Sequence, residues 1–189
     1  MWGIPDYRPY PLNSVEELVN RHGGELAALV GRRLDRTWGL SYVCDGRLCP
    51  TLPLVLDFSG RHLEITFEGW DRLYLSWDQL DLDTVPDEDS QDDPELEVAW
   101  RELDLPELRR LTGARMREVR VLQNDFCFEG VDGRRIEAWV LGGLEFVFEP
   151  SGAALQLFNS LNELSLGYEG PNSGSWQRTA LTFSGFGTS

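Results

Sequence analysis

A ten-residue pattern that occurs twice is the feature that most constrains the fold of this 189-residue chain. Residues 25–34 and 107–116 both follow the pattern E-L-x-x-L-x-G-x-R-[LM], at a spacing of 82 residues. In each copy the two leucines lie three positions apart, which places them on one face of a helical turn. The following glycine adopts a left-handed conformation at little cost, so we expect it to end that turn. The pattern predicts a short helix and then a strand in each half.

A second block of similarity follows the first in the same order. Each copy has a phenylalanine-containing strand, a glycine turn, an apolar strand, and an apolar-x-x-L-x-L segment. Because the spacing here is about 91 residues, the extra residues fall between the blocks, where loops tolerate insertion. The matched segments are 54–58, 60–65 and 70–75 in the first half, and 144–148, 152–157 and 161–166 in the second.

Alternation within these strands predicts the kind of sheet. Leu63, Ile65 and Phe67 alternate with Glu64, Thr66 and Glu68, a pattern typical of an antiparallel sheet with one buried and one solvated face. We therefore predict an α+β fold, a mostly antiparallel sheet from two diverged repeats of a helix, strand and β-hairpin unit. Each unit alone has few strands, so the two are expected to pack as one compact domain. Whether they share one sheet is left open.

The chain divides into four segments on composition. Residues 1–82 form the first unit, with an extended N-terminal stretch and a helix that begins at the capping box of residues 14–17. We expect Gly23-Gly24 to end that helix. Residues 83–95 form an exposed acidic loop, residues 96–169 the second unit, and residues 170–189 a Gly- and Ser-rich tail.

The charge of the chain limits its partners. The formal net charge is −15, and all seventeen basic residues are arginine. Nucleic acids and anionic membranes need positive charge to replace their counterions, so neither is expected as a partner. From Asp78 to Glu97 there are ten acidic residues and no basic one. This stretch predicts a surface that binds a basic protein partner. The residues expected to contact the partner are Asp87, Glu88, Asp89, Asp92 and Asp93.

Motifs that carry chemistry are largely missing. The sequence has no Gly-x-Ser-x-Gly elbow and no glycine-rich phosphate loop. Cys44 and Cys49 are spaced more widely than the usual zinc pair, and whether they form a disulfide is left open. The acidic stretch lacks the glycine and glutamate of a calcium loop. We therefore predict no catalytic residue, metal or cofactor. The tryptophans in strand patterns are expected in the core: Trp38, Trp70, Trp77, Trp100 and Trp139.

The end of the second unit carries a family resemblance. Residues 143–149 (GLEFVFE) and 155–163 (LQLFNSLNE) resemble the F-x-G-x-L-x-I-x-N-x-L-D-E ending of small bacterial proteins of immunity-type (toxin-antidote) and related uncharacterised β-rich families. Asn162 stands where those patterns carry Asp. The resemblance covers about twenty residues and involves structural positions, so it implies kinship of fold more than of activity.

These observations favour an acidic protein-binding module, such as an immunity protein that neutralises a basic bacterial toxin. One alternative is a small-molecule-binding protein or enzyme with a cleft between the repeats. Another is a structural protein without separate chemistry. The sequence contains no apolar run of transmembrane length, and its first residues lack the regions of a signal peptide, so we expect a cytoplasmic protein. Its oligomeric state is left open.

Overall fold

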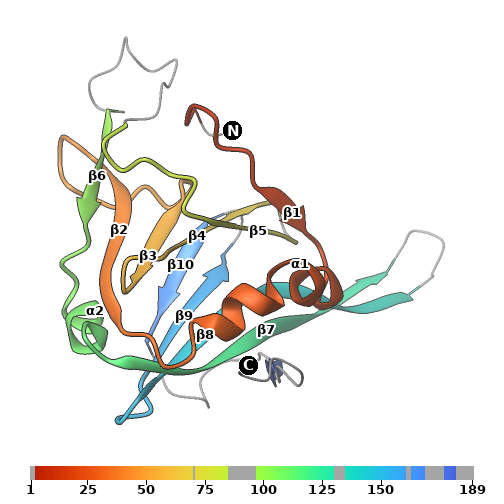
Figure 1. Cartoon of the computed structure of the whole chain (residues 1–189). Helices are drawn as coiled ribbons and strands as arrows, with labels where there is room; N and C mark the ends of the chain where they lie inside the picture. Colours follow the sequence, from red (N-terminus) through yellow and green to blue (C-terminus); the bar gives the residue numbers. More distant parts are fainter. Residues whose placement is uncertain are drawn as a thin grey trace.

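A computed structural model of the chain describes residues 3–69, 71–84, 97–129, 135–160, 163–168 and 177–181. These residues form two helices and two antiparallel sheets (Figure 1). The helices are α1 (Val15–Ala28) and α2 (Pro106–Leu111). The strands are β1 (Tyr10–Leu12), β2 (Leu34–Tyr42), β3 (Leu54–Phe58), β4 (His62–Glu68), β5 (Arg72–Trp77), β6 (Val98–Glu102), β7 (Arg115–Glu129), β8 (Arg135–Glu149), β9 (Ala154–Asn159), β10 (Leu164–Gly167) and β11 (Gln177–Ala180).

The two halves of the chain form separate sheets. The first sheet has the strand order β1-β5-β4-β3-β2-β6, and the second has the order β10-β9-β8-β7-β11. In each sheet four consecutive strands lie side by side as a meander. Strands β1 and β6 flank the meander of the first sheet, and β11 flanks that of the second, whose other edge is β10. One edge strand crosses between the halves, since β6 follows residues 78–97, which we call the acidic segment, but pairs with β2 in the first sheet. Within the tail, β11 pairs with β7 in the second sheet.

Helix α1 begins as predicted but continues further. The hydroxyl of Ser14 accepts a hydrogen bond from the N–H of Glu17, and the Glu17 carboxylate accepts one from the N–H of Asn13. The prediction that Gly23-Gly24 ends this helix is wrong, because the helix runs on to Ala28. The apolar stripe of Leu18 and Leu26 spans the glycines, and its burial outweighs the cost of about 1 kcal/mol per helical glycine.

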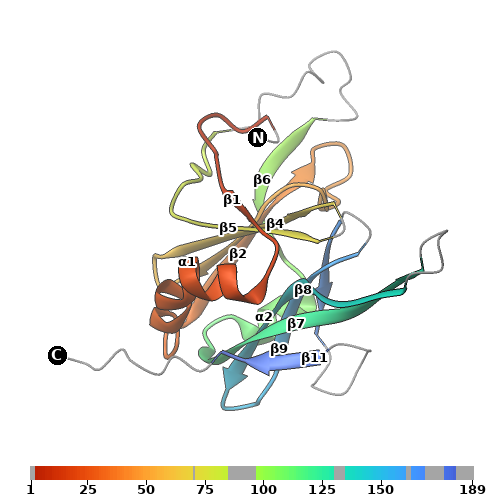
Figure 2. The same ribbon diagram turned by 90° about the vertical axis from the view of Figure 1, so that its right-hand side faces the viewer.

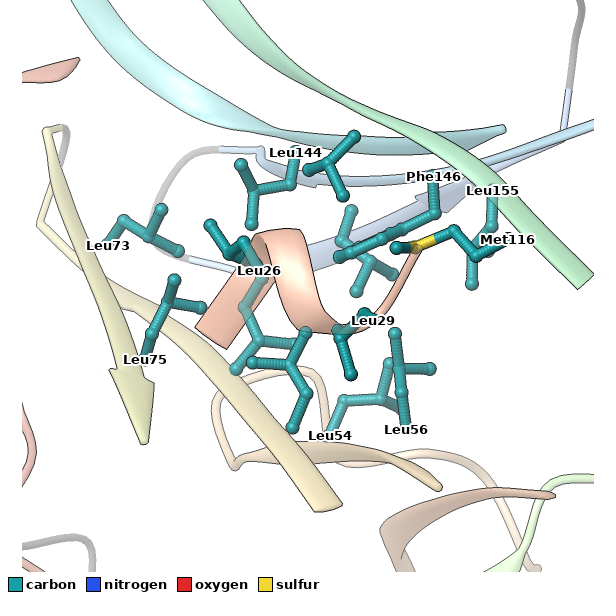
Figure 3. Packing of buried hydrophobic residues seen from close by; sticks show 14 of the residues in the cluster. Leu26, Leu29, Leu54, Leu56, Leu73, Leu75, Met116, Leu144, Phe146 and Leu155 are labelled. Carbon is teal, nitrogen blue, oxygen red and sulfur yellow. The ribbon is translucent and has the colours of Figure 1, made fainter. Parts of the chain in front are cut away.

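The main core lies between the two sheets. Leucines of α1 insert between side chains of the first sheet, such as Leu54 and Leu75, and side chains of the second, such as Leu144 and Phe146 (Figure 3). Phe58 and Phe146 pack across the interface with ring centroids 6.1 Å apart. The antiparallel pairing of the strands confirms the prediction of mostly antiparallel structure. The sequence left open whether the two halves share one sheet, and they form two sheets that pack on one core.

The other face of the first sheet is also covered. A second cluster packs the N-terminal segment, including Ile4 and Tyr7, and Leu80 against Leu40 and Val55 of the sheet. The prediction of a solvated face on β4 is therefore wrong for two of its three residues. Glu64 and Thr66 are fully buried, and only Glu68 is exposed. Alternation identified the two faces of the strand correctly, but no local pattern shows that a distant segment will cover the polar one.

The two sheets are joined by a short crossing of the segments that precede β2 and β7. The N–H of Gly31 donates to the carbonyl of Met116, and the N–H of Gly113 donates to the carbonyl of Leu34, each at 2.7 Å. These bonds exchange places when the residue numbers are shifted by 82, the spacing of the sequence pattern. A further pair of bonds obeys the same rule, from the N–H of Leu34 to Ala114 at 3.1 Å and from the N–H of Met116 to Arg32 at 2.8 Å.

Strands β7 and β8 are longer than any other strand described, at 15 residues each. Residues 124–129 and 135–140 extend past the body of the protein as a two-stranded ribbon (Figure 1, Figure 2), which we call the arm. Among the described residues, these two stretches pair only with each other, because β11 reaches only to Gln123 and β9 only to Gly143. The register shifts next to the arm, between Leu122 and Gln123.

Candidate functional site

The acidic segment is the surface that the sequence selects as a binding site. Its predicted contact residues, Asp87, Glu88, Asp89, Asp92 and Asp93, lie outside the described residues, as does the whole of 85–96. The structure does describe the flanks, residues 78–84 and Glu97. Both flanks attach to the first sheet, as the following contacts show.

A buried carboxylate holds the first flank. Glu64 on β4 is fully buried, and its Oε1 accepts hydrogen bonds from the N–H groups of Gln79 and Leu80, both at 2.6 Å. The Ser76 hydroxyl donates to Glu64 Oε2, and its oxygen lies 3.0 Å from the hydroxyl of Tyr7. One carboxylate thus joins β4, β5, the N-terminal segment and the start of the acidic segment.

The environment of Glu64 shifts the pKa of its carboxyl group. Burial raises the pKa of this carboxyl above its ordinary value, while the bonds from Ser76, Leu80 and Gln79 act in the opposite direction. Burial likewise raises the pKa of the neighbouring Tyr7 phenol. A fully enclosed carboxyl of this kind has no access for a substrate, so the geometry assigns it to anchoring the chain.

The two ends of the acidic segment meet at the β2–β6 end of the first sheet. The indole N–H of Trp100, on β6, donates to the carbonyl of Thr84 at 3.0 Å. The N–H of Val43, which follows β2, donates to the carbonyl of Glu97 at 2.8 Å. The described residues that flank 85–96 are therefore linked to each other at the β2–β6 edge of the first sheet.

The described flanks carry exposed carboxylates of the acidic segment. Asp81, Asp83 and Glu97 are all exposed. Asp81 caps a tight turn, accepting bonds from the N–H of Asp83 at 3.0 Å and from the hydroxyl of Thr84 at 2.9 Å. These bonds lower the pKa of the Asp81 carboxyl, so it stays ionised well into the acidic range.

The outward face of the second sheet carries a charged network. Glu145 is fully buried and accepts bonds from Arg120 at 2.9 Å, Gln156 at 2.7 Å and Arg178 at 3.2 Å. Arg120 also donates to Glu118 at 2.9 Å, and this bond raises the pKa of its guanidinium. Because each charge faces an opposite one, the network ties β11 to β7, β8 and β9.

A pocket of about 320 Å³ opens where the first sheet meets α2. Its lining combines hydroxyls, charged groups and two leucines: Thr37, Glu102, Leu103, Asp104, Leu108, Arg109 and Thr112. The guanidinium of Arg109 forms a two-point ion pair with Asp104, which lowers the pKa of that carboxyl. The pocket lies at the junction of the two halves, and its most prominent charges neutralise each other.

Cysteine and metal chemistry is limited in the described part. None of the three cysteines forms a disulfide; Cys44 and Cys127 are exposed, and Cys49 is buried beside the hydroxyls of Tyr42 and Thr51. Among the described residues, no three side chains of His, Cys, Asp or Glu are grouped so as to hold a metal ion. Cys44 and Cys49, for which the sequence left a disulfide open, are not bridged in the structure.

The tryptophans follow the sequence prediction only in part. Trp38, Trp77 and Trp100 pack against the two clusters, and Trp70 lies outside the described residues. The prediction that Trp139 is in the core is wrong, since 53% of its surface is exposed on the arm. Its strand pattern resembles that of a core strand, but β8 extends beyond the point where the core ends.

Two buried acids were missed by sequence reasoning. Glu64 and Glu145 each interrupt an apolar strand, in Leu63-Glu64-Ile65 and Leu144-Glu145-Phe146. A single acid between two core residues signals only that it faces away from the core.

No family model, curated protein or solved structure matches this chain. In the part of the chain that the structure describes, neither helix has the length and apolar character needed to cross a membrane.

Proposed function

We propose that this chain is an acidic protein-binding module that neutralises a basic protein partner. The candidate partner class is a basic bacterial toxin, and the proposed location is the cytoplasm. The observation that carries the proposal is the concentration of ten carboxylates in residues 78–97, with no basic residue among them, in a stretch whose described flanks are linked to each other.

Physical chemistry favours a basic protein over other partners. Acidic loops accelerate encounter with basic surfaces by long-range attraction, and the effect weakens as salt rises. The hydrogen bond from Trp100 to Thr84 links the described residues on either side of 85–96, so the carboxylates of residues 78–97 belong to one stretch of chain between linked flanks. The net charge of −15 repels nucleic acids and anionic membranes for the same reason.

Affinity capture from native cell extract, followed by binding measurements with the captured protein, tests the proposal. The test variant carries Asn or Gln at Asp87, Glu88, Asp89, Asp92 and Asp93. A matched control carries five neutral replacements at exposed acids elsewhere on the surface: Glu16, Asp71, Glu107, Glu149 and Glu163. Both variants have the same net charge, so they differ only in where the charge is removed.

We expect the segment variant to lose at least tenfold in affinity and most of its salt dependence, while the control keeps more of both. Equal losses in the two variants would show that only overall charge matters. If both variants capture the partner as well as the wild type does, the proposal that the partner is recognised through charge is contradicted.

The pocket at α2 supports a second candidate function, a small-molecule-binding protein. It lies between the two halves, where the alternative hypothesis expects a cleft. A thermal-shift screen of polar metabolites tests this, since a ligand that binds only the folded state raises the Tm. Thr112→Trp, at an exposed position on the pocket rim, should abolish any such shift.

We also infer that the two halves descend from one duplicated unit. Support comes from the reciprocal hydrogen bonds at the crossing and from the equivalent strand order of the two meanders. Gly31 and Gly113 add further support, because each follows the matched leucines in a left-handed conformation.

A further inference from the structure

Trp139 is exposed on the arm, outside the two core clusters. It lies two residues before Leu141 on β8, and Leu141 is buried at the edge of the core. Residues two apart on a strand share a face, so Trp139 continues the core-facing side of β8 beyond the point where the core ends. Exposed tryptophans are costly in water and are enriched at the energetic centres of protein interfaces.

An acidic residue lies directly across the arm from this indole. Asp125 pairs with Trp139 in the β7–β8 register, and side chains of paired residues lie next to each other on one face. The Asp125 side chain is exposed, and its carboxylate makes no hydrogen bond or ion pair with another described residue. Glu137, on the neighbouring pair of that face, is exposed and pairs with Arg135 at 2.7 Å. We call Asp125, Glu137 and Trp139 the aromatic–acidic patch.

We propose that the aromatic–acidic patch binds an arginine side chain of the basic partner. The planar guanidinium stacks on the indole of Trp139 while its N–H groups donate to the carboxylate of Asp125. Arginine fits better than lysine, because only a guanidinium presents a flat face and a fork of donors at the same time. The inference rests on the proposed function and adds a second contact to it, remote in sequence from the acidic segment.

Charge decides between this occupant and a second copy of the chain. Two copies meeting at the patch would bring carboxylates together on molecules that each carry a net charge of −15. Like charges in contact oppose association, whereas a guanidinium neutralises the carboxylate that it approaches. The patch therefore suits a cationic side chain and disfavours self-association.

Titration with hexa-arginine and hexa-lysine peptides tests the inference on the intact protein. The two probes carry the same side-chain charge, so their difference reports guanidinium recognition. Binding is followed by the indole N–H resonances in NMR spectra, and the Trp139 resonance is the one absent from Trp139→Phe. The test variants are Trp139→Ala and Asp125→Asn. Matched controls are Val30→Ala, an exposed apolar residue, and Asp71→Asn, an exposed acid.

We expect hexa-arginine to shift the Trp139 resonance and to bind more tightly than hexa-lysine. Each test variant should weaken hexa-arginine binding about three- to tenfold and remove the preference over lysine, while the controls keep it. An unshifted Trp139 resonance, or a preference retained in Trp139→Ala, overturns the inference. The inference is also overturned if Trp139→Ala weakens hexa-arginine binding and Asp125→Asn does not, because the indole would then bind the peptide without the carboxylate. Sedimentation that shows a dimer lost in Trp139→Ala would assign the patch to a second copy instead.

The variant neutralised at Asp87, Glu88, Asp89, Asp92 and Asp93 separates this inference from the proposed function. If that variant loses partner binding and the arm variants do not, the patch is wrong and the proposed function stands. If the arm variants lose hexa-arginine recognition and the segment variant still binds the captured partner, the patch stands and the role of the segment is wrong.

Discussion

Arg33 and Arg115 face each other across an antiparallel bridge that joins the two sheets. The glycines two residues before them, Gly31 and Gly113, have φ angles of +84° and +81°, with open space where a Cβ would be. Replacing either by Ala should therefore cost only backbone strain, about 1–2 kcal/mol, at both sites alike. Asn, which tolerates this conformation, should recover much of the loss. Urea unfolding of the four variants measures this, and a cost at only one site would contradict the equivalence of the two turns.

Cleavage within the acidic segment should leave the two halves associated. Strand β6 comes after the segment but pairs along β2, and the crossing adds four backbone hydrogen bonds. A protease site inserted in 85–96 would allow the intact protein to be cut after folding. We expect both pieces to co-elute in gel filtration under native conditions and to separate in urea. Separation without denaturant would show that the covalent link is needed to hold the halves together.

Glu64→Gln should change how stability depends on pH. Burial raises the pKa of Glu64 above its ordinary value of 4.5, so the folded state holds this proton more tightly than the unfolded state does. That contribution is complete below pH 4.5 and is lost as the pH rises through the folded-state pKa. The stability of Glu64→Gln relative to wild type should thus rise with pH across this window and then level off, as measured by urea unfolding. A difference that stays constant with pH would mean that Glu64 has an ordinary pKa.

Glu64→Ala is the companion variant, since it removes the acceptor as well as the charge. The buried N–H group of Leu80 would lose its partner, at a cost of about 1–3 kcal/mol, and the part-buried N–H group of Gln79 would lose its partner as well. Thermal unfolding should show a large drop in Tm for Ala and a small change for Gln. Equal effects would contradict the anchoring role.

His22 should make the fold less stable in mild acid. The indole N–H of Trp77 donates to His22 Nδ1 at 3.0 Å, which requires that nitrogen to be unprotonated. Burial lowers the pKa of His22, the Arg21 charge lowers it further, and Glu25 opposes them. The stabilising contribution is present above the ordinary value of 6.5 and is lost as the pH falls from there toward the lower folded-state pKa. The Tm between pH 5 and 7.5 should fall less steeply in His22→Gln; an unchanged slope would exclude this histidine as the cause.

Gly143→Ala should destabilise the second sheet. A Cβ at this position would lie 2.2 Å from the carbonyl oxygen of Leu157 and 2.8 Å from the Cα of Phe158. Since both contacts are with the backbone of β9, the strands must shift apart, at a cost of about 1–3 kcal/mol. For a protein of this size that corresponds to a loss of roughly 2–4 °C in Tm per kcal/mol, measurable by calorimetry. A Tm within one degree of wild type would contradict the close approach of β8 and β9.

Local signals in the sequence predicted local structure well. The capping box at Ser14 and the alternation of Leu63 with Glu64 both correspond to what the structure contains. What failed depended on segments distant in sequence. The covering of Glu64 requires Leu80 and the N-terminal segment, and no pattern in β4 reveals them. The exposure of Trp139 depends on where β9 and β11 end, so its own strand pattern cannot distinguish the core from the arm.

The same limit applies to the candidate site. Charge counting found the acidic segment, because ten acids without a base need no structural context. The Trp100–Thr84 bond that closes the segment joins residues sixteen positions apart, and nothing in either residue's neighbourhood indicates it. Pairing of Asp125 with Trp139 likewise depends on a register that shifts at Leu122, which a count of alternating residues does not locate.

The crossing of β6 into the first sheet has a consequence for synthesis on the ribosome. The chain emerges from its N-terminus, so the first meander is complete before its last edge strand has been made. During that interval the outer edge of β2 is a row of unpaired N–H and carbonyl groups, which can recruit strands of other nascent chains. The acidic segment is translated immediately before β6, so the nascent chain that carries this open edge also carries the ten carboxylates of residues 78–97. Like-charge repulsion between neighbouring nascent chains would then protect the unpaired edge of β2 until β6, which ends at Glu102, has been synthesised.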